Sequence, residues 1–256
     1  MFENQLLERV AKSAPELLQG RLKSFEFANG DVLAEPDAPI QRMVFPCSGL
    51  ISIVVELNEG DQIETGMVGC RGALGGCAIF GAGCHLTRAV AQISGRGWSM
   101  RIEDAKELAG TSPEFRDLVF AQEQYLLAQS TQFAACNAKH VIVQRLCSWL
   151  LRVQDEIGGG ELLMTQENLA KMLGVQRASV SMLASQLQQQ GVISYRRGRL
   201  HISDPEALKA RACECGETLN AQYAQLFAED IDGSAQSAAG NIRLGGETGK
   251  IPAGDI

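Results

Sequence analysis

The sequence predicts an α+β fold class, with an amino-terminal antiparallel β-roll, a long central helix and a carboxy-terminal winged helix-turn-helix. Short alternating strands separated by turn residues fill the chain from about residue 20 to Leu108. Neither Gly nor Pro occurs in residues 114–157, as expected of long helices. Two short helical patterns, split by Gly174 and followed by a hairpin pattern, come next.

The composition is that of an ordinary globular protein. The chain has 256 residues, of which 45% are hydrophobic and 21% charged, and this excludes wholesale disorder and collagen-like repeats. Its length favours two domains over one. No apolar run approaches the ~20 residues of a bilayer-spanning helix, and residues 1–18 lack the apolar centre of a secretory signal. We therefore expect a cytoplasmic protein without a membrane partner.

Residues 1–111 are predicted to form the β-roll. Alternating Ile51, Ile53 and Val55 indicate a half-buried strand, which a turn at residues 58–61 follows. Other strand patterns occupy residues 31–49, 62–69, 88–95 and 98–104. Strands linked by such short turns predict antiparallel pairing.

Residues 112–138 are predicted to form a central dimerisation helix. Ser112-Pro113-Glu114 is typical of a helix start. Partly polar residues recur at coiled-coil spacing after it, and they could pack on the chain's own sheet or form a dimer seam. We favour the seam, because polar positions specify register between partners. The predicted dimer interface consists of Leu118, Gln122, Tyr125, Gln129 and Phe133.

Residues 139–227 are predicted to form the winged helix-turn-helix domain. A short helix capped by Thr165 ends at Gly174, and a second helix then runs to Gly191. Two strands joined by an arginine-glycine turn complete the motif. Residues 228–256 are rich in Gly, Ala and Ser and lack apolar periodicity, so we expect a disordered tail.

One short segment is basic although the protein is acidic. The net charge is -7, whereas residues 163–203 hold five Lys and Arg against one Glu, which gives +4 and leaves -11 for the rest. Three of these cations, Arg196, Arg197 and Arg199, lie beside the turn of the predicted hairpin. Such a local excess is typical of a surface that neutralises phosphates.

These features resemble the Crp/Fnr family of bacterial transcription regulators over about residues 20–225. LAKMLGVQRASVSMLASQLQQQGVI looks like the family's helix-turn-helix signature, while GMVGCRGALGG, RAVAQISG and ARACECGETLNAQY resemble motifs of a subset of its members. The resemblance implies a cyclic-nucleotide-binding-like jelly roll for the β-roll. It also implies a homodimeric, non-enzymatic regulator that recognises palindromic double-stranded DNA, with RNA polymerase as a further candidate partner.

The predicted DNA-binding residues lie on both short helices and on the wing. The second helix is expected in the major groove, with Arg177 as the candidate for a bidentate contact to guanine. Thr165 and Gln166 would donate to phosphate, and the wing arginines would neutralise the backbone. The full set is Thr165, Gln166, Gln176, Arg177, Ala178, Ser179, Ser181, Met182, Arg196, Arg197 and Arg199. Ala178 and Met182 stand where relatives often carry an acid and an arginine, so a different half-site is expected.

A small-molecule effector pocket is predicted where cyclic-nucleotide-binding relatives hold the ribose and the phosphate. The positions are Gly69, Cys70, Gly72, Arg88, Ser130 and Thr131. Cys70 stands where those relatives carry a glutamate, and Ala89 stands where they carry a serine. A neutral thiol cannot replace a carboxylate that accepts from a ribose hydroxyl. We therefore expect no tight binding of cyclic AMP, and the effector is either a different molecule or absent.

The eight cysteines form no Cys-x2-Cys pair, and we expect reduced thiols, no cofactor and no metal. Cys70, Cys77 and Cys84, near His85, are interpreted as small buried hydrophobes. A thiol-based redox-responsive protein that uses these three cysteines is the alternative function, and a winged helix used only for protein contacts is a third. His85, His140 and His201 are interpreted as isolated polar residues. Cys213 and Cys215 are assigned to helix packing, with thiols that point in different directions.

Overall fold

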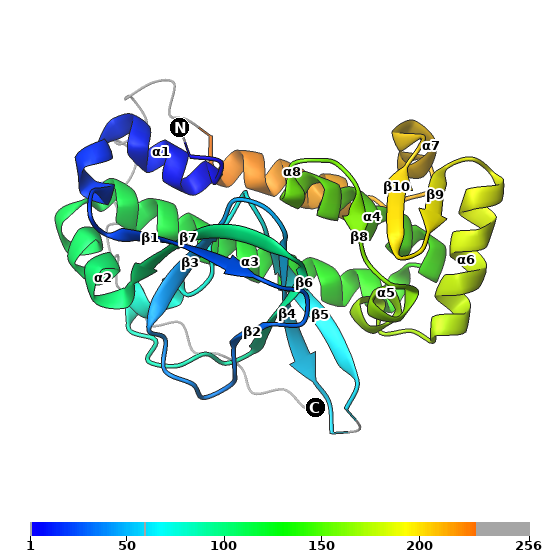
Figure 1. The fold of residues 1–256 in the computed structure, drawn as a ribbon, viewed down its shortest axis with the longest axis horizontal. Coiled ribbons are helices and arrows are strands. Elements are labelled where there is room, and N and C mark those ends of the chain that lie inside the picture. The colour runs from blue at the N-terminus through cyan, green and yellow to red at the C-terminus, as the bar shows by residue number, and fades with distance from the viewer. Residues whose placement is uncertain (1, 59, 229–256) are drawn as a thin grey trace, which may run out of the picture.

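The computed structural model describes residues 2–58 and 60–228, and it confirms the predicted α+β class (Figure 1). The predicted disordered tail lies outside the described residues, apart from Ala228. The helices are α1 (Gln5–Ser13), α2 (Ile102–Thr111), α3 (Pro113–Lys139), α4 (Ile142–Ile157), α5 (Gln166–Leu173), α6 (Arg177–Gln189), α7 (Pro205–Lys209) and α8 (Cys215–Leu226), with 3-10 turns η1 (Pro15–Leu18) and η2 (Gly76–Phe80). The strands are β1 (Leu22–Phe27), β2 (Val32–Ala34), β3 (Arg42–Pro46), β4 (Leu50–Glu56), β5 (Gln62–Val68), β6 (Arg88–Ile93), β7 (Gly95–Arg101), β8 (Leu162–Leu163), β9 (Ile193–Arg196) and β10 (Arg199–Ile202).

Two antiparallel sheets form the amino-terminal part. One has the strand order β1-β7-β3 and the other β2-β6-β4-β5. Their apolar faces enclose a core that includes Val44, Ile51, Val68, Ala89 and Ala91. Alternation in β4 is interrupted by a shift in register between Ile53 and Val54, and Val54 is fully buried while Val55 is exposed.

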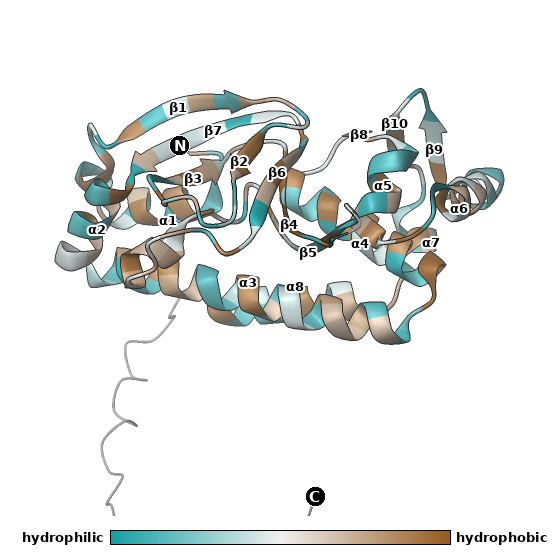
Figure 2. Ribbon diagram, turned by 90° about the horizontal axis from the view of Figure 1, so that it is seen from below, coloured by the Kyte–Doolittle hydropathy of each residue, from teal (hydrophilic) through white to brown (hydrophobic). Residues whose placement is uncertain are grey.

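The long helix α3 runs along one side of the sheets and extends to the carboxy-terminal domain (Figures 1 and 2). Its start agrees with the sequence prediction, because the Ser112 hydroxyl accepts a hydrogen bond from the Phe115 amide at 3.2 Å and Pro113 occupies the first turn. Helix α8 packs along α3, where Tyr223 and Tyr125 meet edge to face with ring centroids 5.1 Å apart.

The carboxy-terminal domain has a three-stranded sheet of order β8-β10-β9 packed with α4, α5 and α6. Its core includes Leu150, Leu169, Val180 and Leu200, all buried. The same apolar cluster continues into the β-roll through β4, β5 and β6, so one hydrophobic core joins the two parts.

A buried carboxyl group marks that junction. Glu64 of β5 is 1% exposed, and its Oε1 accepts a hydrogen bond from Trp149 Nε1 of α4 at 2.7 Å. Its Oε2 accepts from the Ser52 hydroxyl of β4. Burial raises the pKa of Glu64 to about 7, although the two donors and the charge of Arg152 oppose this shift.

Glu64→Gln is expected to reduce the pH dependence of stability. A folded-state pKa raised from 4.5 to about 7 means that the native protein binds more protons than the unfolded chain, so stability falls as pH rises from about 4.5 to 7. One such group contributes up to ~1.4 kcal/mol per pH unit there. Urea unfolding at several pH values should show a shallower decline for the variant.

The exposed Glu26→Gln on β1 is the matched control and should leave the slope unchanged. Equal slopes for wild type and Glu64→Gln would show that Glu64 ionises normally in the folded protein. Burial also raises the pKa of Glu123 and Glu156 to about 7, so a reduced slope rather than a flat profile is expected.

Candidate nucleic-acid interface

A left-handed turn at Gly174 joins α5 to α6. Gly174 has φ +61°, a conformation that L side chains rarely adopt. Its amide donates to the Lys171 carbonyl at 3.1 Å, and the Val175 amide donates to the Ala170 carbonyl at 3.0 Å. These bonds close α5 in the manner of a Schellman end and turn the chain sharply into α6.

Helix α6 buries one face and exposes the other. Val180, Ala184 and Leu187 are buried against the domain core. The predicted contact residues Arg177, Ala178, Ser181 and Met182 are exposed, Gln176 is the exposed N-cap, and Ser179 is half-buried. Met182 is 57% exposed, so its side chain is available for contact with a partner.

Arg177 is the first residue of α6 and forms only a long ion pair with Glu167. Its Nε lies 4.0 Å from Glu167 Oε2 of α5, and both side chains are largely exposed. An exposed pair at this distance contributes little to stability. The guanidinium can therefore leave Glu167 for a stronger acceptor at low cost.

The wing is the β9–β10 hairpin, with Arg197 and Gly198 at its tip. Both tip residues have positive φ, +53° for Arg197 and +76° for Gly198. Arg196 and Arg199 are directly paired across the hairpin, and all three arginines are exposed. Arg199 Nη1 binds Glu161 Oε2 at 2.8 Å, so Arg199 is partly neutralised whereas the tip projects into solvent.

Thr165 and Gln166 lie at the amino end of α5. The Thr165 hydroxyl accepts from the Asn168 amide at 3.1 Å, which confirms the predicted N-cap. A hydroxyl that accepts one hydrogen bond still has its own proton to donate. Thr165 is exposed and Gln166 half-buried.

The amino end of α6 faces the β4–β5 turn of the β-roll. A hollow of about 430 Å³ separates the two, and its lining includes Asp61, Ile63, Lys171 and Arg177. A Cβ at Gly174 would lie 3.4 Å from Ile63. Gly174, in the turn of the helix-turn-helix, therefore lies close to Ile63 at the start of β5.

Three of the five residues of the predicted dimer interface are buried within the protomer. Gln122, Tyr125 and Gln129 are 1%, 4% and 0% exposed, because they face the chain's own β5, its Gly-rich loop and α8. Leu118 and Phe133 are half-buried, and Phe133 lies under the Arg152 guanidinium at 4.3 Å. The alternative interpretation, a helix packed on its own sheet, applies to this face of α3.

The residues of the predicted effector pocket are engaged within the chain. The Gly69 amide donates to Glu156 Oε2 at 3.0 Å, the Cys70 amide donates to the Glu156 carbonyl at 2.8 Å, and a Cβ at Gly72 would lie 2.7 Å from Gln122 Nε2. Side chains of α3 and α4 therefore cover this loop.

The remaining three predicted effector residues are also held by neighbours. Arg88 binds both Glu35 at 3.1 Å and Glu56 at 2.8 Å. The hydroxyl groups of Ser130 and Thr131 donate to the backbone carbonyls of Thr65 and Leu127. In this structure, all six predicted effector positions are therefore in contact with neighbouring groups of the same chain.

Two of the three thiols of the alternative function, Cys70 and Cys77, are poorly suited to nucleophilic chemistry. Burial raises the pKa of both Cys70 and Cys77 to about 11, with Glu156 and Glu123 adding to the shift. A reactive cysteine needs the opposite, a depressed pKa that yields thiolate at neutral pH.

A second group of cysteines corrects two sequence interpretations. Cys136, His140, Cys213 and Cys215 lie together, with their ligand atoms all within 4.8 Å of one another. Cys213 precedes α8 rather than lying in it, so its thiol and that of Cys215 converge instead of diverging. The spacing Cys136-x3-His140 on one helix face was the available signal, and only the fold could add Cys213 and Cys215 to it.

A family model matches the carboxy-terminal domain. Residues 144–211 match the Crp-like helix-turn-helix domain, and this segment contains α5, α6 and the wing. No curated protein matches the chain. None of the helices in the described part of the chain combines the length and the hydropathy that a bilayer crossing requires.

Solved structures share the fold over nearly their full length. FixK2 from Bradyrhizobium japonicum has a TM-score of 0.65 at 15% identity, covering 75% of this chain and 98% of that chain. The c-di-GMP responsive global regulator CLP of Xanthomonas campestris has a TM-score of 0.60 at 16% identity, with 75% and 98% covered. A Crp/Fnr-family transcriptional regulator of Thermus thermophilus has a TM-score of 0.58 at 23% identity, with 76% and 98% covered.

Proposed function

From a Crp-like helix-turn-helix domain set on a Crp/Fnr-type fold, we infer that this chain is a transcription regulator that binds specific DNA sequences as a homodimer. The observation that carries this proposal is the exposed amino-terminal face of α6, with Arg177 at its start and the wing arginines beside it. Solved relatives are named as transcription regulators, which agrees with this proposal.

The positions of the basic residues indicate which of them contact bases and which contact phosphates. Arg177 begins a helix with a free polar face, where a planar guanidinium can pair with the O6 and N7 of guanine in a major groove. Arg196 and Arg197 occupy a narrow hairpin that can follow a phosphate backbone but has no broad face for base edges. Arg177 therefore supplies sequence preference, and the wing supplies affinity that depends on salt.

The dimer surface is proposed on the face of α3 that the chain leaves open. Its residues follow alternating spacings of three and four, the pattern of a coiled-coil seam. They are Phe120, Gln124, Leu127, Thr131, Ala134 and Ala138, all exposed. Phe120 is 50% and Leu127 70% exposed, and the small alanines allow two helices to approach closely. Two copies paired along this seam would present two α6 helices to one palindrome.

Arg177→Ala and Arg197→Ala are expected to weaken DNA binding in different ways. An operator is first selected from a random duplex library. Arg177→Ala should cost about 1–3 kcal/mol on that operator and relax preference at one base pair per half-site. Arg197→Ala should weaken binding to all sequences alike and lower the salt slope by about one unit per protomer.

Fluorescence anisotropy with operator and scrambled duplexes at several salt concentrations measures both effects. Arg21→Ala, a distant arginine paired with Glu107, is the matched control. Selection that yields no shared motif would favour a winged helix that contacts proteins instead of DNA.

The double substitution Phe120→Glu and Leu127→Glu is expected to give folded monomers. Both side chains are exposed, so the protomer keeps its core, whereas two facing seams would bring like charges together. Sedimentation velocity should show the monomer, and operator affinity should fall by about 10²-fold or more, because the two half-sites are no longer linked.

Leu86→Glu tests whether a charge on any exposed apolar residue has the same effect, since Leu86 is 86% exposed and belongs to the loop before β6 rather than to α3. It should remain dimeric. A double variant that sediments as wild type would exclude this face of α3 as the seam.

Cyclic AMP and cyclic GMP are expected not to act as effectors. A nucleotide would have to displace Glu156 from the Gly69 amide and both Glu35 and Glu56 from Arg88. Calorimetry should show no binding up to about millimolar nucleotide, and operator affinity should change by less than about twofold. Micromolar binding accompanied by tighter operator binding would contradict the proposal.

A further inference from the structure

Four ligand side chains converge where α3 ends and α8 begins. Cys136 lies in the last turns of α3 and His140 caps that helix, so the two share one face. Cys213 lies in the turn after α7, and Cys215 is the first residue of α8. Residues separated by more than 70 positions along the sequence therefore meet at one point.

Two of the donor–donor distances match edges of a tetrahedron around a single ion. Cys136 Sγ lies 3.6 Å from Cys213 Sγ, and Cys215 Sγ lies 3.4 Å from His140 Nδ1. Tetrahedral zinc, with Zn–S of ~2.3 Å and Zn–N of ~2.0 Å, requires sulfur atoms about 3.8 Å apart and a sulfur–nitrogen separation of about 3.5 Å. All four donor atoms fall within 4.8 Å of one another, a span that suits one ion and is too tight for an iron–sulfur cluster.

Outer contacts hold these ligands in place. His140 Nε2 lies 3.3 Å from Glu214 Oε1, so the ring can donate to that carboxylate while the neutral Nδ1 faces the thiols. The Gln132 amide donates to Cys215 Sγ at 3.1 Å, as suits a thiolate. A carboxylate behind a ligating histidine is the usual arrangement at zinc sites.

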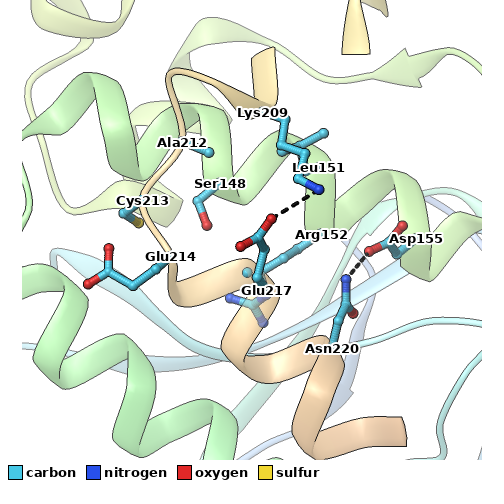
Figure 3. Close-up of a pocket in the computed structure, with 11 residues that line it drawn as sticks. Ser148, Leu151, Arg152, Asp155, Lys209, Ala212, Cys213, Glu214, Glu217 and Asn220 are labelled. Carbon is cyan, nitrogen blue, oxygen red and sulfur yellow. Dashed lines mark hydrogen bonds and ion pairs between the residues drawn. The ribbon is translucent and has the colours of Figure 1, made fainter. Parts of the chain in front are cut away.

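A hollow lies beside this cluster at Cys213. A hollow of about 410 Å³ between α4, α7 and α8 is lined by Cys213, Glu214, Ser148 and Lys209. Figure 3 shows Cys213 and Glu214 in the turn that leads into α8, with Ser148 of α4 opposite. The cysteine side chains themselves are less than 10% exposed, so a bound ion would be shielded from solvent.

We propose that Cys136, His140, Cys213 and Cys215 form a closed zinc site of the Cys3His type. Three thiolates and one imidazole favour a borderline-soft metal, and four protein ligands leave no open position for catalysis. Binding converts three thiols to thiolates and releases their protons, with no change of oxidation state. This proposal does not depend on DNA binding.

The position of the site gives it a mechanical consequence. His140 sits in the two-residue connection between α3 and α4, and Cys213 and Cys215 follow the wing and α7. One ion would therefore fasten both ends of the winged domain to the end of α3. The relative position of α3 and α6 would then depend on metal as well as on apolar packing.

Titration of the chelator-stripped, reduced protein with Co²⁺ decides the proposal. Wild type should bind one equivalent and develop the visible bands and the sulfur-to-metal charge-transfer absorption of tetrahedral cobalt thiolate. Zn²⁺ should displace the cobalt with higher affinity and raise Tm. Cys215→Ser and Cys136→Ser should lose the charge-transfer band, and Glu214→Gln should weaken zinc binding by about 10-fold or more.

Cys84→Ser removes a half-buried cysteine outside the cluster and should bind cobalt as wild type does. Glu214→Gln and His140→Asn change partly exposed side chains, so they test the site even where a cysteine variant fails to fold. Three results would overturn the proposal: no stoichiometric binding by folded wild type, an octahedral cobalt spectrum, or a Cys136–Cys213 disulfide that forms in reducing buffer and prevents binding.

Discussion

The contact between Gln129 of α3 and the edge of β5 determines much of this structure. β5 is the last strand of its sheet, so the outward backbone groups of Met67 have no neighbouring strand. Gln129 Oε1 accepts from the Met67 amide at 2.9 Å, and its Nε2 donates to the Met67 carbonyl at 3.1 Å. A side-chain amide thus replaces the next strand, and the exposed edge is closed without another chain. The same Oε1 accepts from Arg152 Nη2 at 3.0 Å, which brings α4 to this point.

This contact fixes the rotation of α3 about its own axis. With Gln129 turned to the sheet, Gln122 and Tyr125 must also face inward, and Phe120, Gln124 and Leu127 on the opposite side of the helix must face out. The same rotation places Cys136 and His140, about two and three turns further along, beside the start of α8. The proposed seam and the proposed zinc site would therefore both follow from the orientation that this buried glutamine gives α3.

The sequence predicted the local elements well and the faces of α3 poorly. Ser112, Gly174 and the Arg197-Gly198 turn act through nearby backbone, so their roles follow from short-range chemistry. The side on which a glutamine packs depends instead on a strand edge about 60 positions away, which no local pattern encodes. Polar residues at coiled-coil spacing favour the prediction of a dimer interface. A buried glutamine can equally form its hydrogen bonds with the backbone of its own chain, as Gln129 does with Met67. The prediction that the Cys213 and Cys215 thiols diverge is wrong for a related reason. Cys213 lies in the turn before α8, so the helical geometry behind that prediction does not apply to the pair.

Buried polar contacts hold the winged domain in a way that apolar packing alone would not. The shared apolar core can tolerate small displacements of α4 relative to β5, because the hydrophobic effect is not directional. The Trp149 contact to Glu64 and the Gly69 contact to Glu156 depend on direction as well as distance, and losing either would remove a hydrogen-bond donor from a buried carboxyl group. Their cost is the desolvation that raises the pKa of both carboxyl groups to about 7. These hydrogen bonds therefore add a directional constraint to the apolar packing that positions the winged domain. In the proposed dimer, this constraint would help to fix the spacing between the two α6 helices that a palindromic site requires.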